Sequence, residues 1–421
     1  MLRLIHCADL HLSEREREYC LAVFEEIIDQ ANRRDVAAVL ISGDFFDTYA
    51  DAEALRGEVR EIAAKFSGEI LYIPGNHEEL QSGVARKSKS ETKSGSKAKP
   101  KAKSKSASPG GDSQLHPIEV LDLSPITVIH HAPCTFLERM YTDVAVEIVA
   151  IPHQAQYGDY QSWNIPAKRA PLRLAMAHGI VTGLAYAGPD EEAGAGMLDP
   201  LLFNFHSVDY AALGHIHARR LERHGGTVFC YPGSTRVWRR GESGERGFAL
   251  LSYDPRTASL QPEFVPVECA GVYREIAVPL SLTADSVDSV ELRDDNAWHT
   301  EDYVELRLSG LVEDERAVAD LIEQLRSKFE KSARRFEIRR DDVEVLPGIS
   351  SEPMVRKFLD LWEQREPVLA HAHADEAGEG AAADARKNRA LQIYERDRAV
   401  WFRSREIALL EIKRLLDSRS R

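Results

Sequence analysis

The chain has 421 residues, a formal net charge of −14, 43 % hydrophobic residues and five cysteines. This length predicts two or three domains, and this hydrophobic content excludes a globally disordered chain. The cysteines are odd in number and lack Cys-x-x-Cys spacing, which argues against a disulfide framework or a zinc–thiolate site. No apolar run approaches the roughly 20 residues that span a bilayer, and the N-terminus does not read as a signal peptide. We therefore expect a cytoplasmic protein with no membrane association.

The first 80 residues alternate strands and helices. Apolar runs predict strands over residues 2–8, 36–41 and 70–73, and apolar residues at helical spacing predict helices over about 21–31 and 51–66. This order predicts parallel strands joined by right-handed crossovers, and therefore an α/β fold. In such sheets the functional groups gather beyond the carboxyl ends of the strands.

The segment over residues 86–112 is rich in Lys, Ser, Gly, Ala and Pro and has no apolar period. We interpret it as a disordered insertion. It is either a solvated surface loop, which we favour, or a basic arm that is attracted to phosphates.

A second strand-rich layer follows the insertion. Its strands are predicted over residues 126–130, 144–151, 172–177, 208–213, 227–231 and 248–253. The Gly- and Ala-rich stretch 182–197 predicts a flexible loop beside the site.

A small α+β unit is predicted next. Its strands are expected over residues 273–278, 303–308, 335–338 and 343–345, and its helix over 313–331. The domain boundaries we expect are 1–268, 269–348, an amphipathic helix over 350–366, a flexible linker over 367–384 and a basic helix over 385–421. The last helix either packs on its own chain or docks a partner.

Polar residues follow five of the predicted strands. They are Asp9, His11, Asp44, Asn76, His77, His178, His215 and His217. Carboxylate, amide and imidazole groups without a thiolate suit Mn²⁺, Fe²⁺ or Zn²⁺ in a catalytic site. Seven ligands with one shared carboxylate fit two metals roughly 3.5–4 Å apart, which activate a water and hold phosphoryl oxygens. His77 directly follows a ligand, so its imidazole is expected to reach a leaving or non-bridging oxygen and stabilise developing charge.

Two details of this set can be tested against a structure. Asp47 is either a carboxylate that orients a ligand histidine or a helix cap. Strand alternation across Ile216 predicts that His215 and His217 point to the same side.

Together these motifs resemble the calcineurin-like metallophosphoesterase superfamily, and within it the SbcD-type nucleases of DNA double-strand-break repair. The residues that carry the resemblance are Asp9-Leu-His11, Gly43-Asp44-Phe-Phe-Asp47, Gly75-Asn76-His77-Glu78, Ala177-His178-Gly179, Gly214-His215-Ile-His217 and Tyr231-Pro232-Gly233-Ser234. The resemblance covers about residues 1–265 and is weaker, at the level of layout, beyond 270.

The resemblance implies a four-layer sandwich of two mixed sheets flanked by helices, a small α+β capping domain and C-terminal helices. It implies two metal groups that share Asp44: a first group of Asp9, His11, Asp44 and His217, and a second group of Asp44, Asn76, His178 and His215. It also implies manganese as the metal and His77 as the transition-state residue. Asp47 and Glu78 would support the ligands. Glu78 stands where the family usually has Asp, and we expect it to hold a neighbouring His or Arg.

The function we expect is that of a two-metal DNA phosphodiesterase, both exonuclease and endonuclease, in break repair. The resemblance implies a homodimer and an SbcC-type ATPase docked on the C-terminal helices, for which residues 355–362 are a candidate face. One alternative is a metallophosphoesterase that acts on a small-molecule or nucleotide phosphodiester, as the acidic net charge favours. Another is a scaffold with weak catalysis that mainly binds a partner ATPase.

Overall fold

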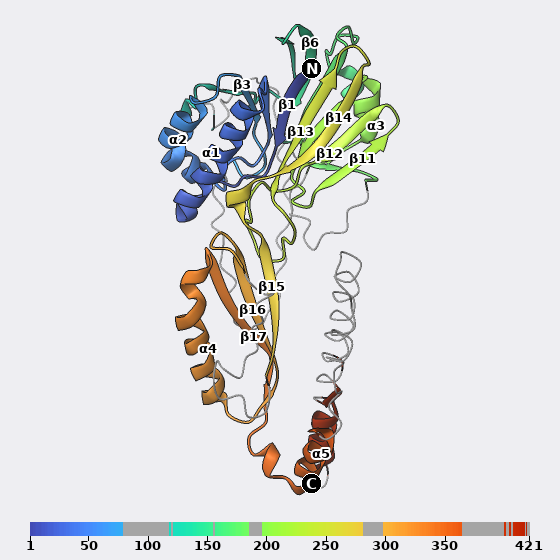
Figure 1. The fold of residues 1–421 in the computed structure, drawn as a ribbon. Coiled ribbons are helices and arrows are strands. Elements are labelled where there is room, and N and C mark those ends of the chain that lie inside the picture. The colour runs from blue at the N-terminus through green and yellow to red at the C-terminus, as the bar shows by residue number, and fades with distance from the viewer. Residues whose placement is uncertain are drawn as a thin grey trace, which may run out of the picture. The chain divides into compact units, whose positions relative to one another are not determined.

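The computed structural model describes residues 1–78, 118, 121–154, 156–184, 196–280, 298–363, 400, 404, 405, 407–416 and 418 (Figure 1). The predicted insertion over 86–112, the linker over 367–384 and most of the loop over 182–197 lie outside the described residues, as does much of the basic helix over 385–421. The chain divides into two compact units, Met1–Val272 and Tyr273–Arg421. Among the described residues, no helix combines the length and the apolar character needed to cross a membrane.

The first unit contains two six-stranded sheets. The first sheet has the order β14-β13-β1-β2-β3-β4, with strands β14 (Ser259–Pro266), β13 (Gly247–Asp254), β1 (Leu2–Cys7), β2 (Ala38–Ser42), β3 (Glu69–Ile73) and β4 (Ile126–Val128). Strands β1 to β4 are parallel, whereas β13 and β14 run antiparallel to their neighbours. The predicted parallel order of the first three strands is therefore confirmed.

The second sheet has the order β11-β12-β10-β7-β6-β5. Its strands are β11 (Arg220–His224), β12 (Thr227–Tyr231), β10 (Tyr210–Gly214), β7 (Leu172–His178), β6 (Val144–Ile151) and β5 (Thr135–Tyr141). The four central strands are parallel, and the two edge strands pair antiparallel with them. Both sheets are thus mixed.

Alternating side chains of the strands fill three separate cores. On β1, Leu4 points into the core between the two sheets, where it joins Leu174 and Met176 of β7. Ile5 points the other way, into the core under helices α1 (Arg17–Arg33) and α2 (Tyr49–Ala63). Helix α3 (Pro200–Phe205) covers the outer face of the second sheet. Two mixed sheets flanked by helices confirm the predicted α/β sandwich.

The second unit is a three-stranded sheet with one long helix. Strands β15 (Tyr273–Leu280), β16 (Tyr303–Val312) and β17 (Arg335–Val345) are parallel, and α4 (Glu315–Phe329) packs on them. The two strands predicted over 335–338 and 343–345 form the single strand β17, because an irregular register near Arg307 and Ser309 lets the pairing continue. Asp314 caps α4 by accepting a hydrogen bond from the N–H of Arg316.

Helix α5 (Pro353–Glu363) packs with part of the C-terminal helix in the same unit. Val355 and Leu409 are fully buried in one apolar cluster with Leu311, Leu346 and Ile349. Of the two alternatives for the C-terminal helix, packing on its own chain therefore holds around Leu409.

Sequence analysis missed several elements. They are β5, β11, β14, α3 and the short parallel pair β8 (Ile180–Val181) and β9 (Met197–Leu198). The loop predicted over 182–197 includes Met197, but Met197 belongs to strand β9.

Candidate metal centre

Five strands of the two sheets deliver polar side chains to one place. Asp9 and His11 follow β1, Asp44 follows β2, and Asn76 and His77 follow β3 of the first sheet. His178 ends β7 and His215 follows β10 of the second sheet. All of these positions lie at carboxyl ends of strands, where parallel α/β sheets place their functional groups.

The two sheets touch at this point through hydrogen bonds from side chains to backbone carbonyls. The imidazole of His178 donates from Nδ1 to the carbonyl of Ser42 at 2.9 Å, and the Ser42 hydroxyl donates to the carbonyl of Ala212 at 3.0 Å. A Cβ atom at Gly214 would lie 1.9 Å from the Ser42 carbonyl oxygen, and one at Gly43 would lie 2.0 Å from Nδ1 of His178. Glycine at both positions therefore lets groups from the two sheets approach one another closely.

Three residues of the predicted first metal group lie together. Ligand atoms of Asp9, His11 and His217 lie within 4.8 Å of one another, and all three residues are buried. The Nε2 atoms of His11 and His217 are 3.1 Å apart. Asp44 joins this group at longer range, with its Oδ2 4.0 Å from Nε2 of His11.

The second group converges around Asp44 and Asn76. Ligand atoms of Asp44, His178 and His215 lie within 4.8 Å of one another. The Oδ1 of Asn76 is 3.0 Å from Nε2 of His178 and 3.2 Å from Nδ1 of His215. Oδ2 of Asp44 lies 3.2 Å from Nε2 of His178, so Asp44 stands between the two groups.

The backbone is strained at these residues. Asp9, His11, Asp44 and His215 have φ angles of 54°, 45°, 47° and 99°. Non-glycine residues in this left-handed region cost of order 1–3 kcal/mol each, and such strain concentrates at functional sites. Four of the seven predicted ligands therefore adopt conformations that the surrounding fold must enforce.

The chemistry of the donors fits divalent cations. Because Nδ1 of His178 donates to a carbonyl, Nε2 is the nitrogen that faces Asp44, and it offers a lone pair to a metal once its proton is displaced. Facing lone pairs and buried carboxylates repel one another unless cations lie between them. Burial raises the pKa of Asp9 to about 6. Burial alone would lower the pKa of His178, but the nearby carboxylate of Asp44 raises it to about 9. Both pKa values are raised, so both groups hold a proton more tightly than usual, and the site therefore attracts positive charge.

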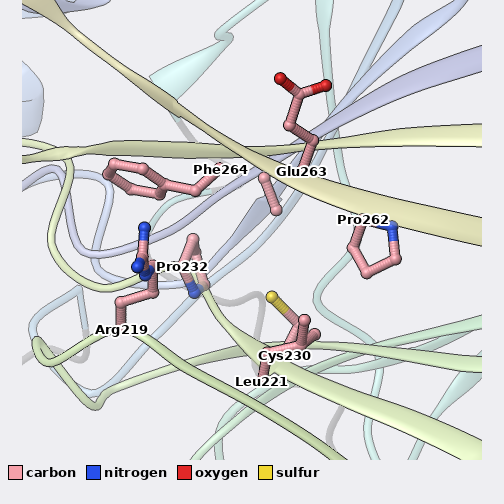
Figure 2. A pocket seen from close by; sticks show the side chains of 8 residues that line it. Arg219, Leu221, Cys230, Pro232, Pro262, Glu263 and Phe264 are labelled. Atoms are coloured by element: carbon pink, nitrogen blue, oxygen red, sulfur yellow. The ribbon is translucent and has the colours of Figure 1, made fainter.

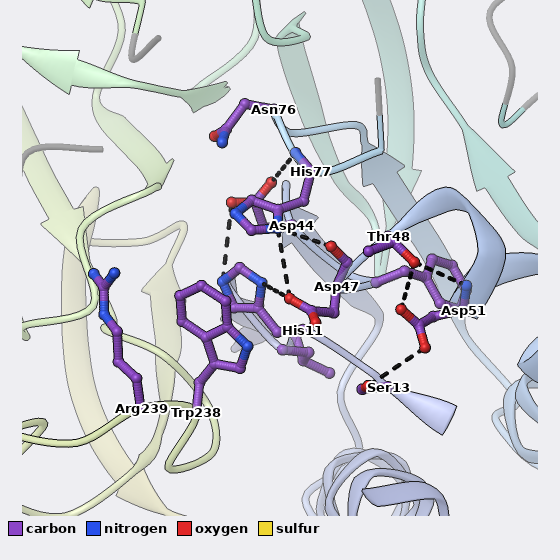
Figure 3. A network of polar contacts seen from close by, with 12 residues as sticks. His11, Ser13, Asp44, Asp47, Thr48, Asp51, Asn76, His77, Trp238 and Arg239 are labelled. Atoms are coloured by element: carbon purple, nitrogen blue, oxygen red, sulfur yellow. Dashed lines mark hydrogen bonds and ion pairs between the residues drawn. The ribbon is translucent and has the colours of Figure 1, made fainter. Parts of the chain in front are cut away.

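His77 lies beside the first group. Its backbone N–H donates to Oδ1 of Asp44 at 3.0 Å, and its Nδ1 lies 2.8 Å from the carbonyl oxygen of Asp47. Its ring centroid is 4.6 Å from that of His11 (Figure 3). A ligand atom of His77 also lies within 4.8 Å of those of His11 and Asp44. Its predicted role as a residue that does not bind metal remains a prediction.

The structure separates the two alternatives for Asp47. Its Oδ1 lies 3.7 Å from Nδ1 of His11 and 3.6 Å from Nδ1 of His77. The cap of α2 is instead Thr48, whose hydroxyl accepts a hydrogen bond from the N–H of Asp51. Asp47 therefore faces the histidines and does not cap the helix.

Glu78 contacts the backbone of two loops. Its two carboxylate oxygens accept hydrogen bonds from the backbone N–H groups of Phe46 and Gly75, at 2.9 and 2.8 Å. The prediction that it holds a neighbouring His or Arg stays a prediction. Burial and the nearby Asp44 raise the pKa of Glu78 to about 7. The residue ties the loop after β2 to the loop after β3.

The expected alternation at Gly214-His215-Ile216-His217 does not occur. Strand β10 ends at Gly214, and the φ of 99° at His215 turns the chain. His215 then faces Asn76, whereas His217 faces His11. A bend in the backbone, and not strand pleating, divides the two imidazoles between the two groups.

The Tyr231-Pro232-Gly233-Ser234 motif supports this bend. The Tyr231 hydroxyl donates to the carbonyl of Gly179 at 2.9 Å and accepts from the N–H of Val181 at 3.0 Å. The N–H of Ser234 donates to the carbonyl of His217 at 3.1 Å. The motif therefore anchors the loops that carry His178 and His217.

Sequence analysis missed three residues at the centre, all from the segment after β12. Trp238 stacks on His11 with ring centroids 3.9 Å apart and an interplanar angle of 7° (Figure 3). The buried guanidinium of Arg236 donates to the carbonyls of Leu10 and His11. The carboxylate of Glu242 contacts Nδ1 of His217. These three residues do not stand at the end of a predicted strand. The only sequence signal for them is that they follow the Tyr231-Pro232-Gly233-Ser234 motif.

A separate cavity of about 300 Å³ lies in the first unit, between strands of the two sheets (Figure 2). Its walls are mostly apolar, and the guanidinium of Arg219 lies 4.4 Å from the ring centroid of Phe264. None of the predicted metal ligands lines it.

Residues 2–219 match the family described as calcineurin-like phosphoesterase, which is more than half of the chain. No curated protein matches the chain. Among solved structures, one that is similar is GAP50, the anchor in the inner membrane complex of Plasmodium, with 12 % identity, a TM-score of 0.37 and coverage of 64 % of this chain and 86 % of that chain. Another is the purple acid phosphatase PPD1 from yellow lupin, Lupinus luteus, with 14 % identity, a TM-score of 0.37 and coverage of 65 % and 52 %. A third is Vps29 complexed with zinc from Entamoeba histolytica, with 13 % identity, a TM-score of 0.29 and coverage of 63 % and 100 %. TM-scores this low add nothing to the family match.

Proposed function

Because the chain belongs to the calcineurin-like phosphoesterase family, we propose that it is a two-metal DNA phosphodiesterase of SbcD type, an exonuclease and endonuclease in double-strand-break repair. The family makes it a metal-dependent hydrolase. The observation that carries the two-metal proposal is the convergence of seven donors into two groups around Asp44. We propose manganese as the metal, because the SbcD-type resemblance implies it and the carboxylate, amide and imidazole donors are compatible with it.

The residues of the centre have different proposed roles in hydrolysis. Metals bound to the first group (Asp9, His11, Asp44 and His217) and the second group (Asp44, Asn76, His178 and His215) would supply a nucleophilic water and neutralise phosphoryl oxygens. His77 supplies a hydrogen-bond donor beside them. Its Nδ1 lies 2.8 Å from the carbonyl oxygen of Asp47, and its ring lies beside the first group, where it would donate to an oxygen of the phosphodiester. The carboxylate of Asp47 lies 3.6 Å from the same Nδ1.

Two sequence features favour DNA as the substrate. The net charge is +8 over residues 86–105 and +6 over residues 386–421, and such stretches attract a polyanion. The Tyr231-Pro232-Gly233-Ser234 motif of the SbcD-type resemblance holds the loops of the centre. The net charge of −14 favours the alternative, a phosphoesterase acting on a small-molecule or nucleotide phosphodiester.

A paired assay separates these functions. The full chain is incubated with Mn²⁺ and linear double-stranded DNA, and in parallel with a nucleotide phosphodiester. We expect metal-dependent loss of the DNA, abolished in an Asp44→Asn control that removes the shared carboxylate. Intact DNA beside a cleaved nucleotide ester would establish the alternative. Failure to cleave either would favour the scaffold function.

We further propose that an SbcC-type ATPase docks on the C-terminal helices, and that the phosphoesterase domain forms a homodimer. Val355 of α5 is buried by its own chain, but Met354 and Leu361 of α5 are 42 % and 51 % exposed, and Ile407 and Leu415 are 60 % and 50 % exposed. Apolar side chains left exposed on amphipathic helices are suited to a helical partner. Leu361→Asp should abolish co-purification of the ATPase and leave Mn²⁺-dependent hydrolysis unchanged. Retained co-purification would place the partner elsewhere.

A further inference from the structure

A tight turn over residues 238–242 closes against the metal centre. Its last residue, Glu242, has a side chain that is only 8 % exposed. One carboxylate oxygen, Oε2, accepts the backbone N–H groups of Trp238 and Arg239 at 2.9 and 3.2 Å. The other oxygen, Oε1, contacts Nδ1 of His217. A single carboxylate thus joins the turn to a predicted ligand.

The same turn also contacts His11, the other imidazole of the first group. The Trp238 ring stacks on His11, and the guanidinium of Arg239 lies 5.0 Å from the Trp238 ring centroid (Figure 3). Nε2 of His11 and Nε2 of His217 are the atoms that face one another, 3.1 Å apart. The contacts of the turn therefore fall on both histidines of the first group.

We propose that Glu242 is a positioning residue that holds His217 in its Nδ1-protonated tautomer, and thereby sets the metal affinity of the first group. A carboxylate oxygen can only accept a hydrogen bond, so the proton of a neutral His217 lies on Nδ1 and the lone pair on Nε2. Carboxylates behind a ligand histidine fix its tautomer and orientation, and their loss typically weakens metal binding about 10–100-fold. The inference rests on the proposed function in one respect, namely that the centre binds divalent metal.

The chemistry of the turn makes Glu242→Gln a sharp test. The carboxylate accepts from three donors, whereas a carboxamide has one accepting oxygen and one donating nitrogen. If the oxygen stays with the N–H groups of Trp238 and Arg239, the amide nitrogen faces Nδ1 of His217. That ring must then accept at Nδ1 and carry its proton on Nε2, the atom that faces the metal group. Glu245→Gln is the matched control, because Glu245 lies in the same segment but is exposed.

The tautomer is measured in protein stripped of metal. Two-bond ¹H–¹⁵N correlations of ¹⁵N-histidine protein, assigned with a His217→Gln variant, report which ring nitrogen carries the proton. We expect the Nδ1-protonated form in wild type and in Glu245→Gln, and the Nε2-protonated form in Glu242→Gln. An unchanged His217 signal in Glu242→Gln would overturn the assignment.

Metal affinity is measured calorimetrically with Mn²⁺ alone as the probe. We expect Glu242→Gln to weaken one of two binding steps by about 10–100-fold and to leave the other unchanged. His178→Ala, which removes a ligand of the second group, should weaken the other step. Equal weakening of both steps by Glu242→Gln, or no weakening, would overturn the inference. Glu242→Asp is the second variant if Glu242→Gln does not fold: it keeps the charge but is one methylene shorter, so it should weaken the same step.

The outcomes also distinguish this inference from the proposed function. Wild-type protein that binds no Mn²⁺ would overturn the proposed function and with it the role of Glu242 in affinity. Two intact Mn²⁺ steps in wild type, with neither altered by Glu242→Gln, would overturn only the role of Glu242.

Discussion

His77 occupies an unusual place among the imidazoles of the centre. Its ring lies edge-on to His11 at a centroid distance of 4.6 Å, but its Nδ1 faces the carbonyl of Asp47 rather than a carboxylate of a metal group. We expect His77→Ala to lower kcat about 10²–10³-fold, the usual cost of removing one donor that stabilises developing charge. The bound Mn²⁺, measured by elemental analysis, should stay at the wild-type level.

The control for His77→Ala is Asn76→Ala, which removes the neighbouring donor from the second group. That variant should lose metal as well as activity, because Oδ1 of Asn76 lies close to both His178 and His215. Parallel loss of metal and activity in His77→Ala would instead make His77 a ligand.

Some residues of the centre could be predicted from the sequence and others could not. Asp9, Asp44 and His178 each stand at the end of an apolar strand, so their positions follow from the strand pattern. Glu78 was noticed, but its backbone partners depend on how two loops meet in space. Trp238 and Glu242 lie in a polar segment with no periodic pattern. Their roles come from a turn folded back onto the loop after β10, which no local pattern encodes.

At the scale of elements, the contact between β2 and β10 sets the spacing of the two sheets. Gly214→Ala places a Cβ atom 1.9 Å from the Ser42 carbonyl and 2.8 Å from Nδ1 of His178. We expect it to destabilise the fold by about 1–3 kcal/mol, as for other overpacked sites, and to weaken Mn²⁺ binding by displacing His178. Urea denaturation and calorimetry measure the two effects.

Gly57 provides the matched control for that substitution. It lies inside α2, and a Cβ atom there would meet nothing within 4 Å. Gly57→Ala should therefore stabilise the protein by about 0.5–1 kcal/mol through helix propensity, with Mn²⁺ binding unchanged. Equal effects of the two substitutions would mean that the close approach of the two sheets does not depend on glycine at position 214.

A buried ion pair joins β6 to the start of β7. The guanidinium of Arg173 donates to Glu147 at 2.7 Å, and the side chains are 1 % and 3 % exposed. Removing one partner of such a pair costs about 3–5 kcal/mol, because the other charge stays buried and unpaired. Glu147→Ala should lower the free energy of unfolding by that amount at neutral pH, as measured by urea denaturation.

The same pair predicts a dependence on pH. Burial alone would raise the pKa of Glu147, but the N–H groups of Arg169 and Ala170 and the guanidinium of Arg173 lower it below its ordinary value of 4.5. A carboxylate whose pKa is lowered by folding stabilises the fold fully above its ordinary pKa. This contribution is lost as the pH falls from the ordinary pKa through the lowered one. The stability difference between wild type and Glu147→Ala should therefore shrink below pH 4.5. A difference that stays constant in acid would contradict the paired carboxylate.

The central strands were predictable because they are buried on both faces and read as apolar runs. The edge strands were not. Strand β11, Arg-Leu-Glu-Arg-His, is largely exposed, and β14 contains Pro262 in its interior. Edge strands tolerate charges and proline because one side of each faces no partner strand. Their composition therefore resembles that of loops.

At the scale of the whole molecule, charge is separated along the chain. The net charge is −14, although residues 86–105 carry +8 and residues 386–421 carry +6. The remaining residues therefore carry −28. A polyanionic substrate would be repelled by most of this chain, so recognition of DNA would depend on where its basic stretches lie.

Deletion of residues 87–111 tests the larger basic stretch directly. These residues form no part of the predicted metal groups, so we expect the deletion to leave Mn²⁺-dependent hydrolysis of short substrates largely intact. Loss of folding, detected by circular dichroism, would contradict our interpretation of the insertion as disordered. The salt dependence of cleavage of long DNA then separates the two alternatives for the segment. If the segment is a solvated loop, the slope of log binding against log salt concentration should be the same with and without the segment. A basic arm predicts a shallower slope after the deletion, by about 0.9 for each phosphate that the segment neutralises.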